Sequence, residues 1–143
     1  MNVKIKLIDK SLPIPQYQTK GAVAFDFYSR VNIKIPKKST KIIPLNVVAK
    51  VPKNTMLLLA GRSSLPKKGL MVANSIGIID QDYCGENDEI CLFVYNFSNK
   101  TAQVNKGERI AQGIFVHISK VSKFIPVNVQ NTKSRGGFGS TGK

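Results

Sequence analysis

The 143-residue chain has no tryptophan, one histidine, two cysteines and eight acidic residues. With His117 as the single histidine, a site that needs a histidine pair has no second member to use. Cys84 and Cys91 are too few for a disulfide framework and lack the further ligands of a zinc site, so we expect a reducing compartment: the cytoplasm, or the nucleus in a eukaryotic host. The chain also lacks a run of about 18 apolar residues and an apolar signal core, so we expect neither a membrane span nor secretion.

The shortage of acidic residues leaves a net charge of +14 against 22 lysines and arginines. The lysines are scattered along the chain and do not form one stripe. Three explanations fit this composition: a solvated lysine-rich surface, a nucleic-acid patch, or a field that attracts a small polyanion to one site. Composition alone does not separate them.

Apolar residues alternate with polar ones in the manner of half-buried strands at 3–7 and 31–35. Short apolar runs follow, separated by turns rich in Pro, Asn and Gly, at 41–52, 55–61, 89–97, 101–105 and 109–118. This spacing is typical of an all-β sandwich or barrel in a single domain. One helical turn is possible within 63–71, where Pro66 keeps it short. After Pro126 the chain is polar and glycine-rich, so we expect a flexible tail.

Four segments carry polar residues that strands and turns alone do not explain. "GRSSL" at 61–65 places a guanidinium and two hydroxyls at a possible helix start, which suits an anion site or a plain N-cap. Residues 77–89 hold five of the eight acidic residues. Among them, Asp80 follows an apolar strand and is either a partly buried base or part of a polar hairpin tip.

The other two segments lie nearer the C-terminus. In "GERIAQGIFV" at 107–116, Arg109 and Gln112 interrupt a strand otherwise suited to burial. Either a polar side chain faces a cleft, or Arg109 forms a structural ion pair with Glu108 or another carboxylate. "RGGFGSTG" at 135–142 is either a disordered end or a segment that approaches phosphates closely, with one aromatic ring that could stack on a base.

Taken in order, these segments resemble the five motifs of the deoxyuridine triphosphatase (dUTPase) family, from about residue 20 to residue 142. "AVAFDFYS" at 22–29 is similar to the first motif and "GRSS" at 61–64 to the second. "NSIGIIDQDYCGE" at 74–86 is similar to the third, which is the most specific. "GERIAQGIF" at 107–115 and "GGFGSTG" at 136–142 are similar to the fourth and fifth.

The resemblance implies an all-β, jelly-roll-like β-barrel over 1–127. It also implies a flexible Gly-rich C-terminal arm over 128–143 that closes over a neighbouring active site in a homotrimer. The implied reaction is hydrolysis of dUTP to dUMP and pyrophosphate by Mg²⁺-assisted attack of water on the α-phosphate, which keeps uracil out of DNA and supplies dUMP for dTMP synthesis. No membrane and no obligatory nucleic acid are implied.

The resemblance also implies a role for each motif residue. Asp80 would hold and activate the attacking water, Tyr83 would exclude a 2′-hydroxyl, and Asp26 would act on the metal through its water shell. Arg109 would support the site from behind as an ion-pair partner. Uracil would be read by Asn74 and by the backbone of the strand that follows, Gly77, Ile78 and Ile79. The remaining expected substrate ligands are Arg62, Ser63, Ser64, Gln112, Lys133, Arg135, Phe138, Gly139, Ser140 and Thr141.

The chain departs from the family pattern in two places that matter. The arginine expected before the fifth motif falls on Lys133, with Arg135 two residues later, so which of them reaches the γ-phosphate is open. A lysine supplies the charge but not the bidentate fork. The hairpin after "DYCG" is about three residues longer than usual, and we interpret Asn87, Asp88 and Glu89 as a surface loop at its tip with no assigned role.

Two other functions compete with this one. The related dCTP deaminases share an "RSSL"-like motif, but they place a glutamate three residues before the asparagine that ends the hairpin strand. That asparagine is Asn96 here and the position is Phe93, so the deaminating carboxylate is missing. A basic β-barrel that binds nucleic acid or a regulatory protein without turnover is the second alternative. Asp80, Tyr83 and Gln112 argue against it.

Overall fold

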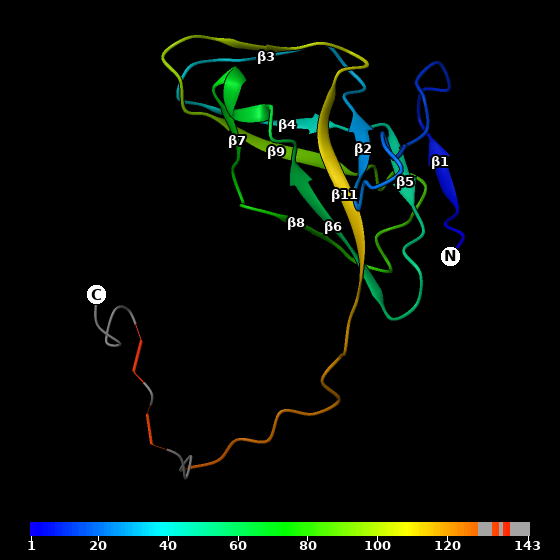
Figure 1. Ribbon diagram of the computed structural model, residues 1–143, viewed down its shortest axis with the longest axis vertical. Helices are drawn as coiled ribbons and strands as arrows, with labels where there is room; N and C mark the ends of the chain where they lie inside the picture. Colours follow the sequence, from blue (N-terminus) through cyan, green and yellow to red (C-terminus); the bar gives the residue numbers. More distant parts are fainter. Residues whose placement is uncertain (129–132, 135, 138–143) are drawn as a thin grey trace.

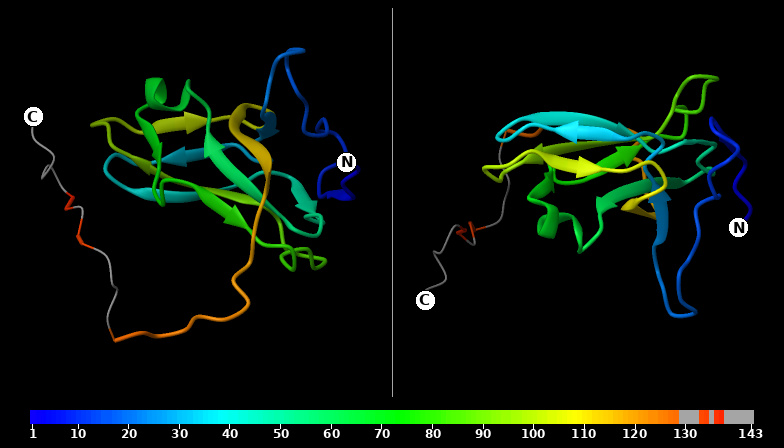
Figure 2. Two further views of the ribbon diagram at one scale, coloured as in Figure 1. Left: turned by 60° about the horizontal axis from the view of Figure 1, so that its bottom comes forward. Right: turned by 90° about the horizontal axis from the view of Figure 1, so that it is seen from above.

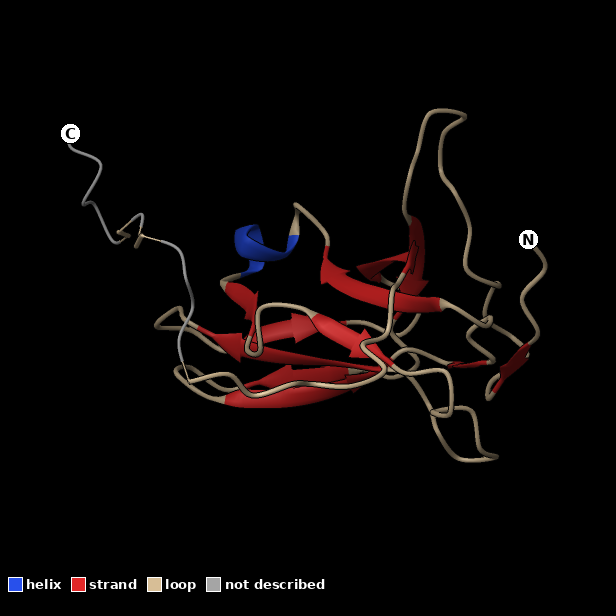
Figure 3. Cartoon of the chain, turned by 90° about the horizontal axis from the view of Figure 1, so that it is seen from below, coloured by secondary structure: helices blue, strands red, loops and turns tan. Residues whose placement is uncertain are grey.

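The computed structural model describes residues 1–128, 133–134 and 136–137, and this part of the chain is built from short strands (Figure 1). The only helix in it is one 3₁₀ turn, η1 (Leu65–Lys68), visible in Figure 3. The strands are β1 (Ile5–Leu7), β2 (Phe25–Tyr28), β3 (Ile33–Ile35), β4 (Thr40–Pro44), β5 (Val47–Ala49), β6 (Thr55–Gly61), β7 (Leu70–Val72), β8 (Gly77–Ile79), β9 (Cys91–Asn96), β10 (Ala102–Val104) and β11 (Arg109–His117).

The strands form four antiparallel sheets. The largest has the order β2-β11-β6-β8 and the next has the order β4-β9-β7, while β1 pairs with β5 and β3 with β10. Figure 2 shows the two larger sheets as facing layers. Within the described residues these sheets do not join into one continuous closed barrel.

A single hydrophobic core lies between the layers. Alternation along β6 buries Leu57 and Leu59, and alternation along β9 buries Leu92 and Val94, so each sheet turns one face inward. All four side chains belong to one buried cluster. The prediction of an all-β fold is therefore confirmed, including the short helical turn, which ends at Gly69 with a φ of 75°.

The middle of β11 needs a glycine for packing. A Cβ atom placed on Gly113 would lie 2.7 Å from the Phe27 ring and 3.1 Å from the Phe25 ring. The two rings pack across this strand with centroids 5.4 Å apart. The glycine thus lets aromatic side chains of β2 approach the backbone of β11, the strand that carries the fourth motif.

Both ends of the chain differ from the alternating pattern. The predicted strand at 3–7 is shorter, β1 (Ile5–Leu7), and Ile5 is 40% exposed in the single chain. After β11, residues 118–128 form no strand and lead away from the sheets (orange in Figure 1). Arg135 and residues 138–143 lie outside the described residues, so the division into a domain over 1–127 and an arm over 128–143 stays a prediction. No helix in the described part is long and apolar enough to cross a membrane.

Candidate active site

The predicted base-reading residues lie on and before an edge strand. β8 pairs with β6 at the end of the four-stranded sheet, with Gly77 opposite Leu59 and Ile79 opposite Leu57. A Cβ atom on Gly77 would lie 3.1 Å from the Leu59 Cβ, so glycine allows the close approach of the two strands. The outer edge of such a strand offers backbone N–H and C=O groups that can read a planar ligand by hydrogen bonds.

Asn74 precedes β8 in a tight turn. The backbone N–H of Ile76 donates to the Asn74 carbonyl at 2.7 Å across Ser75, whose φ is 64°. This is a γ-turn with a non-glycine residue in the left-handed region, and such turns are rare and strained. Strain of this kind is concentrated at binding and catalytic sites.

Asp80 is the first residue after β8. Of the two alternatives for Asp80, a partly buried base or part of a polar hairpin tip, the first does not hold in the single chain, because Asp80 is exposed. Its backbone carbonyl accepts a hydrogen bond from the N–H of Tyr83 at 3.4 Å, which closes the turn. Among residues 1–128 and the short described pieces beyond them, its carboxylate has neither an ion-pair nor a hydrogen-bond partner. It is therefore available to hold a water molecule by a hydrogen bond.

Tyr83 stands beside Asp80 with a ring held at its far end. Its hydroxyl donates to the backbone carbonyl of Glu89 at 3.0 Å, and the residue is 41% exposed. Partial burial is the main cause that raises the pKa of the phenol above its ordinary value. The ring can therefore present an apolar face to a ligand while its hydroxyl keeps its proton and its partner.

The residues on and around β8, from Asn74 to Tyr83, form a first group of predicted site residues. A second group surrounds Asp26, which is 5% exposed. The Nε of Arg62 lies 3.0 Å from one carboxylate oxygen of Asp26, and Nη1 of Arg109 lies 3.2 Å from the other. In the pairing of β11 with β2, the register shifts between Arg109 and Ala111. One buried carboxylate thus orients two guanidinium groups, and the trio keeps a net positive charge. The alternative in which Arg109 forms a structural ion pair with Glu108 or another carboxylate is confirmed, with Asp26 as the partner, while Glu108 pairs with Lys68.

The neighbouring residues of the second and fourth motifs join this group. Gln112 lies opposite Asp26 on one side and opposite Ala60 on the other, and its Nε2 donates to the Gly61 carbonyl at 3.2 Å. Ser63 and Ser64 are exposed between β6 and η1. Ser64 occupies the N-cap position, but its hydroxyl makes no capping hydrogen bond. Its side chain therefore does not do the capping that the plain N-cap alternative required, and both serines stay exposed directly after Arg62 in the chain.

The two groups lie at opposite ends of β6. Ile79 is opposite Leu57, whereas Arg62 follows Leu57 by five residues, which is about 16 Å of extended strand. Asp80 lies one residue farther from Arg62 than Ile79 does. A single chain consequently separates the predicted water-activating carboxylate from the predicted phosphate ligands. Of the tail residues, Lys133 is described and exposed, while Arg135, Phe138, Gly139, Ser140 and Thr141 lie outside the described residues.

The acidic residues do not form a metal cage. In the part of the chain that the structure describes, no group of three or more His, Cys, Asp and Glu side chains could hold a metal ion. Asp26 is already the counter-ion of two arginines, which favours contact with a metal through water over direct ligation. Mg²⁺ commonly keeps several waters and binds through one or two carboxylates plus substrate phosphates. The residues present fit a Mg²⁺ that arrives with a phosphorylated ligand.

Comparison with known proteins shows which family this chain belongs to. The family model described as dUTPase matches residues 10–142. The chain belongs to the dUTPase family. The deoxyuridine 5′-triphosphate nucleotidohydrolase of Dictyoglomus turgidum is 36% identical over 148 residues and covers 99% of each chain. The protein of the same name from Nautilia profundicola is 34% identical, with both chains covered completely.

Solved dUTPases have the same fold. The dUTPase of Streptococcus mutans superposes with a TM-score of 0.76 at 28% identity, covering 83% of this chain and 98% of the other. The dUTPase of Staphylococcus bacteriophage 80alpha with dUpNHpp superposes with a TM-score of 0.85, covering 99% and 98% of the two chains. Its 22% identity supports the fold alone. The predicted jelly-roll-like architecture is confirmed by these likenesses.

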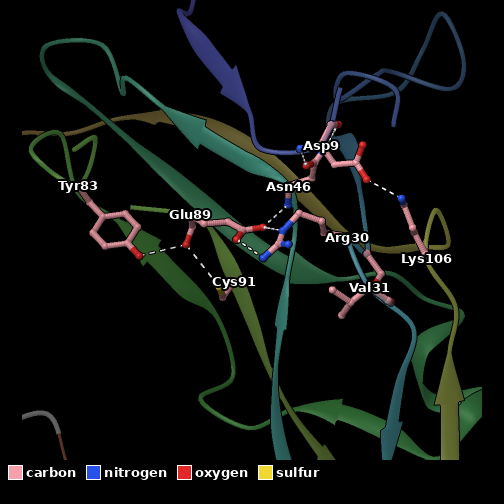
Figure 4. A network of polar contacts seen from close by, with 9 residues as sticks. Asp9, Arg30, Val31, Asn46, Tyr83, Glu89, Cys91 and Lys106 are labelled. Carbon is pink, nitrogen blue, oxygen red and sulfur yellow. Dashed lines mark hydrogen bonds and ion pairs between the residues drawn. The ribbon is translucent and has the colours of Figure 1, made fainter. Parts of the chain in front are cut away.

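The interpretation of Asn87 to Glu89 as a surface loop is wrong for Glu89. Its side chain is 13% exposed and forms a bidentate ion pair with Arg30, with N–O distances of 2.8 and 2.9 Å. Figure 4 shows this pair at the base of the loop, next to the Tyr83 hydroxyl. Sequence reasoning missed it because the local composition of "GENDE" is that of a solvated turn, and the partner lies 59 residues away.

Proposed function

We propose that this protein is a dUTP diphosphatase, which hydrolyses dUTP to dUMP and pyrophosphate and so keeps uracil out of DNA and supplies dUMP for dTMP synthesis. The observation that carries the proposal is the position of Asp80: an exposed carboxylate, without an ion-pair partner among the described residues, directly after the edge strand of the most specific family motif. Family membership over nearly the whole chain supports the substrate.

In the proposed reaction, Asp80 orients a water molecule and accepts its proton as the oxygen attacks the α-phosphorus. The bond from this phosphorus to the bridging oxygen breaks, and pyrophosphate leaves with the bonding electrons. A positioned carboxylate of this kind typically contributes about 10²- to 10⁴-fold to the rate. Asn74 and the backbone of 77–79 read uracil at the edge of β8, and Tyr83 covers the deoxyribose.

The phosphate chain is assigned to the second group. Arg62, Ser63, Ser64 and Gln112 bind its oxygens, while Arg109 holds Asp26 and thereby orients Arg62. The positive charge around Asp26 and the overall charge of +14 suit a polyanionic substrate. Mg²⁺ on the triphosphate would neutralise part of its charge, with Asp26 acting through a water molecule. Lys133 or Arg135, together with residues 138–141, would complete the phosphate and base contacts.

We further propose that the active enzyme is a homotrimer. The separation of Asp80 from Arg62 along β6 supports this, because a second copy can bring the missing half of the site. An apolar groove of 950 Å³, lined by residues that include Ile5, Tyr17 and Phe115, supports it as well. Residues 118–127 carry exposed Phe124 and Ile125, at 84% and 73%. We assign the groove to this segment of another copy, whose apolar side chains would otherwise stay in water.

The proposal is tested by measuring pyrophosphate release from dUTP, dCTP, UTP and dTTP with Mg²⁺. Wild type should turn over dUTP alone at a substantial rate. Asp80→Asn should lower kcat for dUTP by about 10²- to 10⁴-fold and leave the Kd of dUpNHpp nearly unchanged. Glu108→Gln is the matched control, because it removes one carboxylate charge from a partly exposed ion pair with Lys68. A wild type that hydrolyses none of the four nucleotides would establish the binding-module alternative.

A further inference from the structure

We propose that Glu89 is a positioning residue for sugar selection. Its ion pair with Arg30 fixes the backbone that holds the hydroxyl of Tyr83, and so determines how strictly the site rejects a 2′-hydroxyl. This inference rests on the proposed function and deepens it. It assigns a task to Glu89, one of the three residues by which this hairpin exceeds the family pattern.

The Tyr83 ring is held at both ends. At its backbone end, the Tyr83 N–H donates to the Asp80 carbonyl at 3.4 Å. At its far end, the hydroxyl donates to the Glu89 carbonyl at 3.0 Å. A ring that excludes a substituent by contact must not yield when the larger sugar presses on it. Of the two anchors, only the carbonyl of Glu89 restrains the hydroxyl end.

Glu89 can serve as this anchor because its carboxylate is fixed on two sides. The Nε and Nη2 of Arg30 each donate to a different oxygen, at 2.8 and 2.9 Å. The backbone N–H of Asn46 donates to one of these oxygens, at 2.8 Å. A bidentate guanidinium–carboxylate pair is strong and restricts direction as well as distance. The carbonyl of Glu89 also accepts the S–H of Cys91 at 3.4 Å.

The partners of Glu89 are themselves held by other elements. The Arg30 N–H donates to the Pro44 carbonyl at 2.9 Å, which ties the end of β2 to β4. Asn46 adopts a φ of 70°, and its side-chain amide donates to the Asp9 carbonyl at 2.9 Å, while its side-chain oxygen accepts the Asp9 N–H at 2.6 Å. Figure 4 shows the unbroken series of contacts from Tyr83 to Asp9. The position of the Tyr83 hydroxyl is therefore fixed, through Glu89, by residues of several other elements.

The outer part of the same loop is attached separately and weakly. Glu86 pairs with Lys6 at the surface, and their side chains are 80% and 43% exposed. An exposed pair of this kind restrains little. The loop thus offers an internal control: Lys6→Met removes its outer attachment, and Glu89→Gln weakens its inner one with almost no change of shape.

The experiment compares kcat/KM for dUTP with kcat/KM for UTP. In Glu89→Gln the ratio should fall by roughly 10- to 100-fold, the effect expected of a displacement of about 1 Å at a positioned group. Most of this change should come from a gain with UTP. Tyr83→Phe should lower the ratio similarly, since it removes the same hydrogen bond and leaves the ion pair intact. The double variant should be no worse than the poorer single variant, and Lys6→Met should keep the wild-type ratio.

Other outcomes overturn the inference in distinguishable ways. If Glu89→Gln lowers the melting temperature but leaves the ratio unchanged, Glu89 is only structural. If Tyr83→Phe alone leaves the ratio unchanged, the hydroxyl contact does not matter, and this result can be obtained even if Glu89→Gln fails to fold. If wild type does not hydrolyse dUTP, the proposed function fails and this inference fails with it.

Discussion

Replacing Asp26 with asparagine tests the electrostatic centre of the second group. Asparagine has nearly the same shape as aspartate, so the change creates no cavity. The side-chain oxygen of asparagine can still accept a hydrogen bond from one arginine. Its NH₂ group, however, points N–H donors at the N–H donors of the second arginine. The Asp26 side chain is 7% exposed, so two guanidinium groups are left without a counter-ion at a buried position.

The expected cost follows from this geometry. Breaking a fully buried ion pair by removing one partner costs about 3–5 kcal/mol. The Arg62 and Arg109 side chains are 29% and 39% exposed, so water compensates part of the loss and we expect about 2–4 kcal/mol. For a domain of this size that corresponds to a fall in Tm of roughly 5–15 °C. The measurement is urea unfolding at fixed protein concentration, because the proposed assembly would also stabilise the fold.

Glu108→Gln is the matched control for this change. It also removes one carboxylate charge, but Glu108 pairs with Lys68 near the surface, where such pairs are worth about 0–1 kcal/mol. The double variant Asp26→Asn/Arg109→Gln should recover part of the loss, since it removes one of the uncompensated cations. If the free energies of unfolding of Asp26→Asn and Glu108→Gln differ by less than about 0.5 kcal/mol, the ion pairs of Asp26 do not stabilise the fold as we reason.

Three further predictions concern other parts of the chain. Gly113→Ala should destabilise the fold by about 1–3 kcal/mol, because its Cβ would meet the rings of β2; an unchanged urea midpoint would refute the close packing. The ion pair with Lys106, more than any other contact, holds the pKa of Asp9 below its ordinary value. Stability from this group is therefore complete above the unfolded pKa of about 3.9 and is lost as the pH falls further, so Asp9→Asn should flatten the acid part of the stability curve. Burial raises the pKa of the Cys91 thiol, so at pH 8 iodoacetamide should modify Cys91 far more slowly in the native protein than in urea, as mass spectrometry can show.

The strands could be predicted from the sequence because their signals are local. The alternation at 31–35, the apolar run at 109–118 and the turns between the apolar runs correspond to β3, β11 and the connections of the fold. The family motifs likewise predict roles for Asp80 and Arg62 without any knowledge of their neighbours. Such features depend on a few adjacent residues, and the backbone geometry of a strand or turn then follows.

The partners of the charged residues could not be predicted in this way. Asp26 meets Arg109 across 83 positions and Glu89 meets Arg30 across 59, and no local pattern encodes such pairs. Composition suggested a solvated tip for Glu89, yet the acidic side chain is satisfied by a distant arginine and a backbone N–H. The burial of Asp80 also stayed open between two alternatives, because a residue at the end of an edge strand can face water even when the strand is apolar.

The placement of Asp80 and Arg62 at opposite ends of one strand has a genetic consequence. If they serve different sites of the assembled enzyme, two inactive variants, one altered at each position, complement each other when they are unfolded and refolded together. Random mixing in equal amounts then makes about a quarter of the sites intact. Either variant refolded alone stays inactive. A cell carrying one allele of each kind would keep a working enzyme that neither allele encodes by itself.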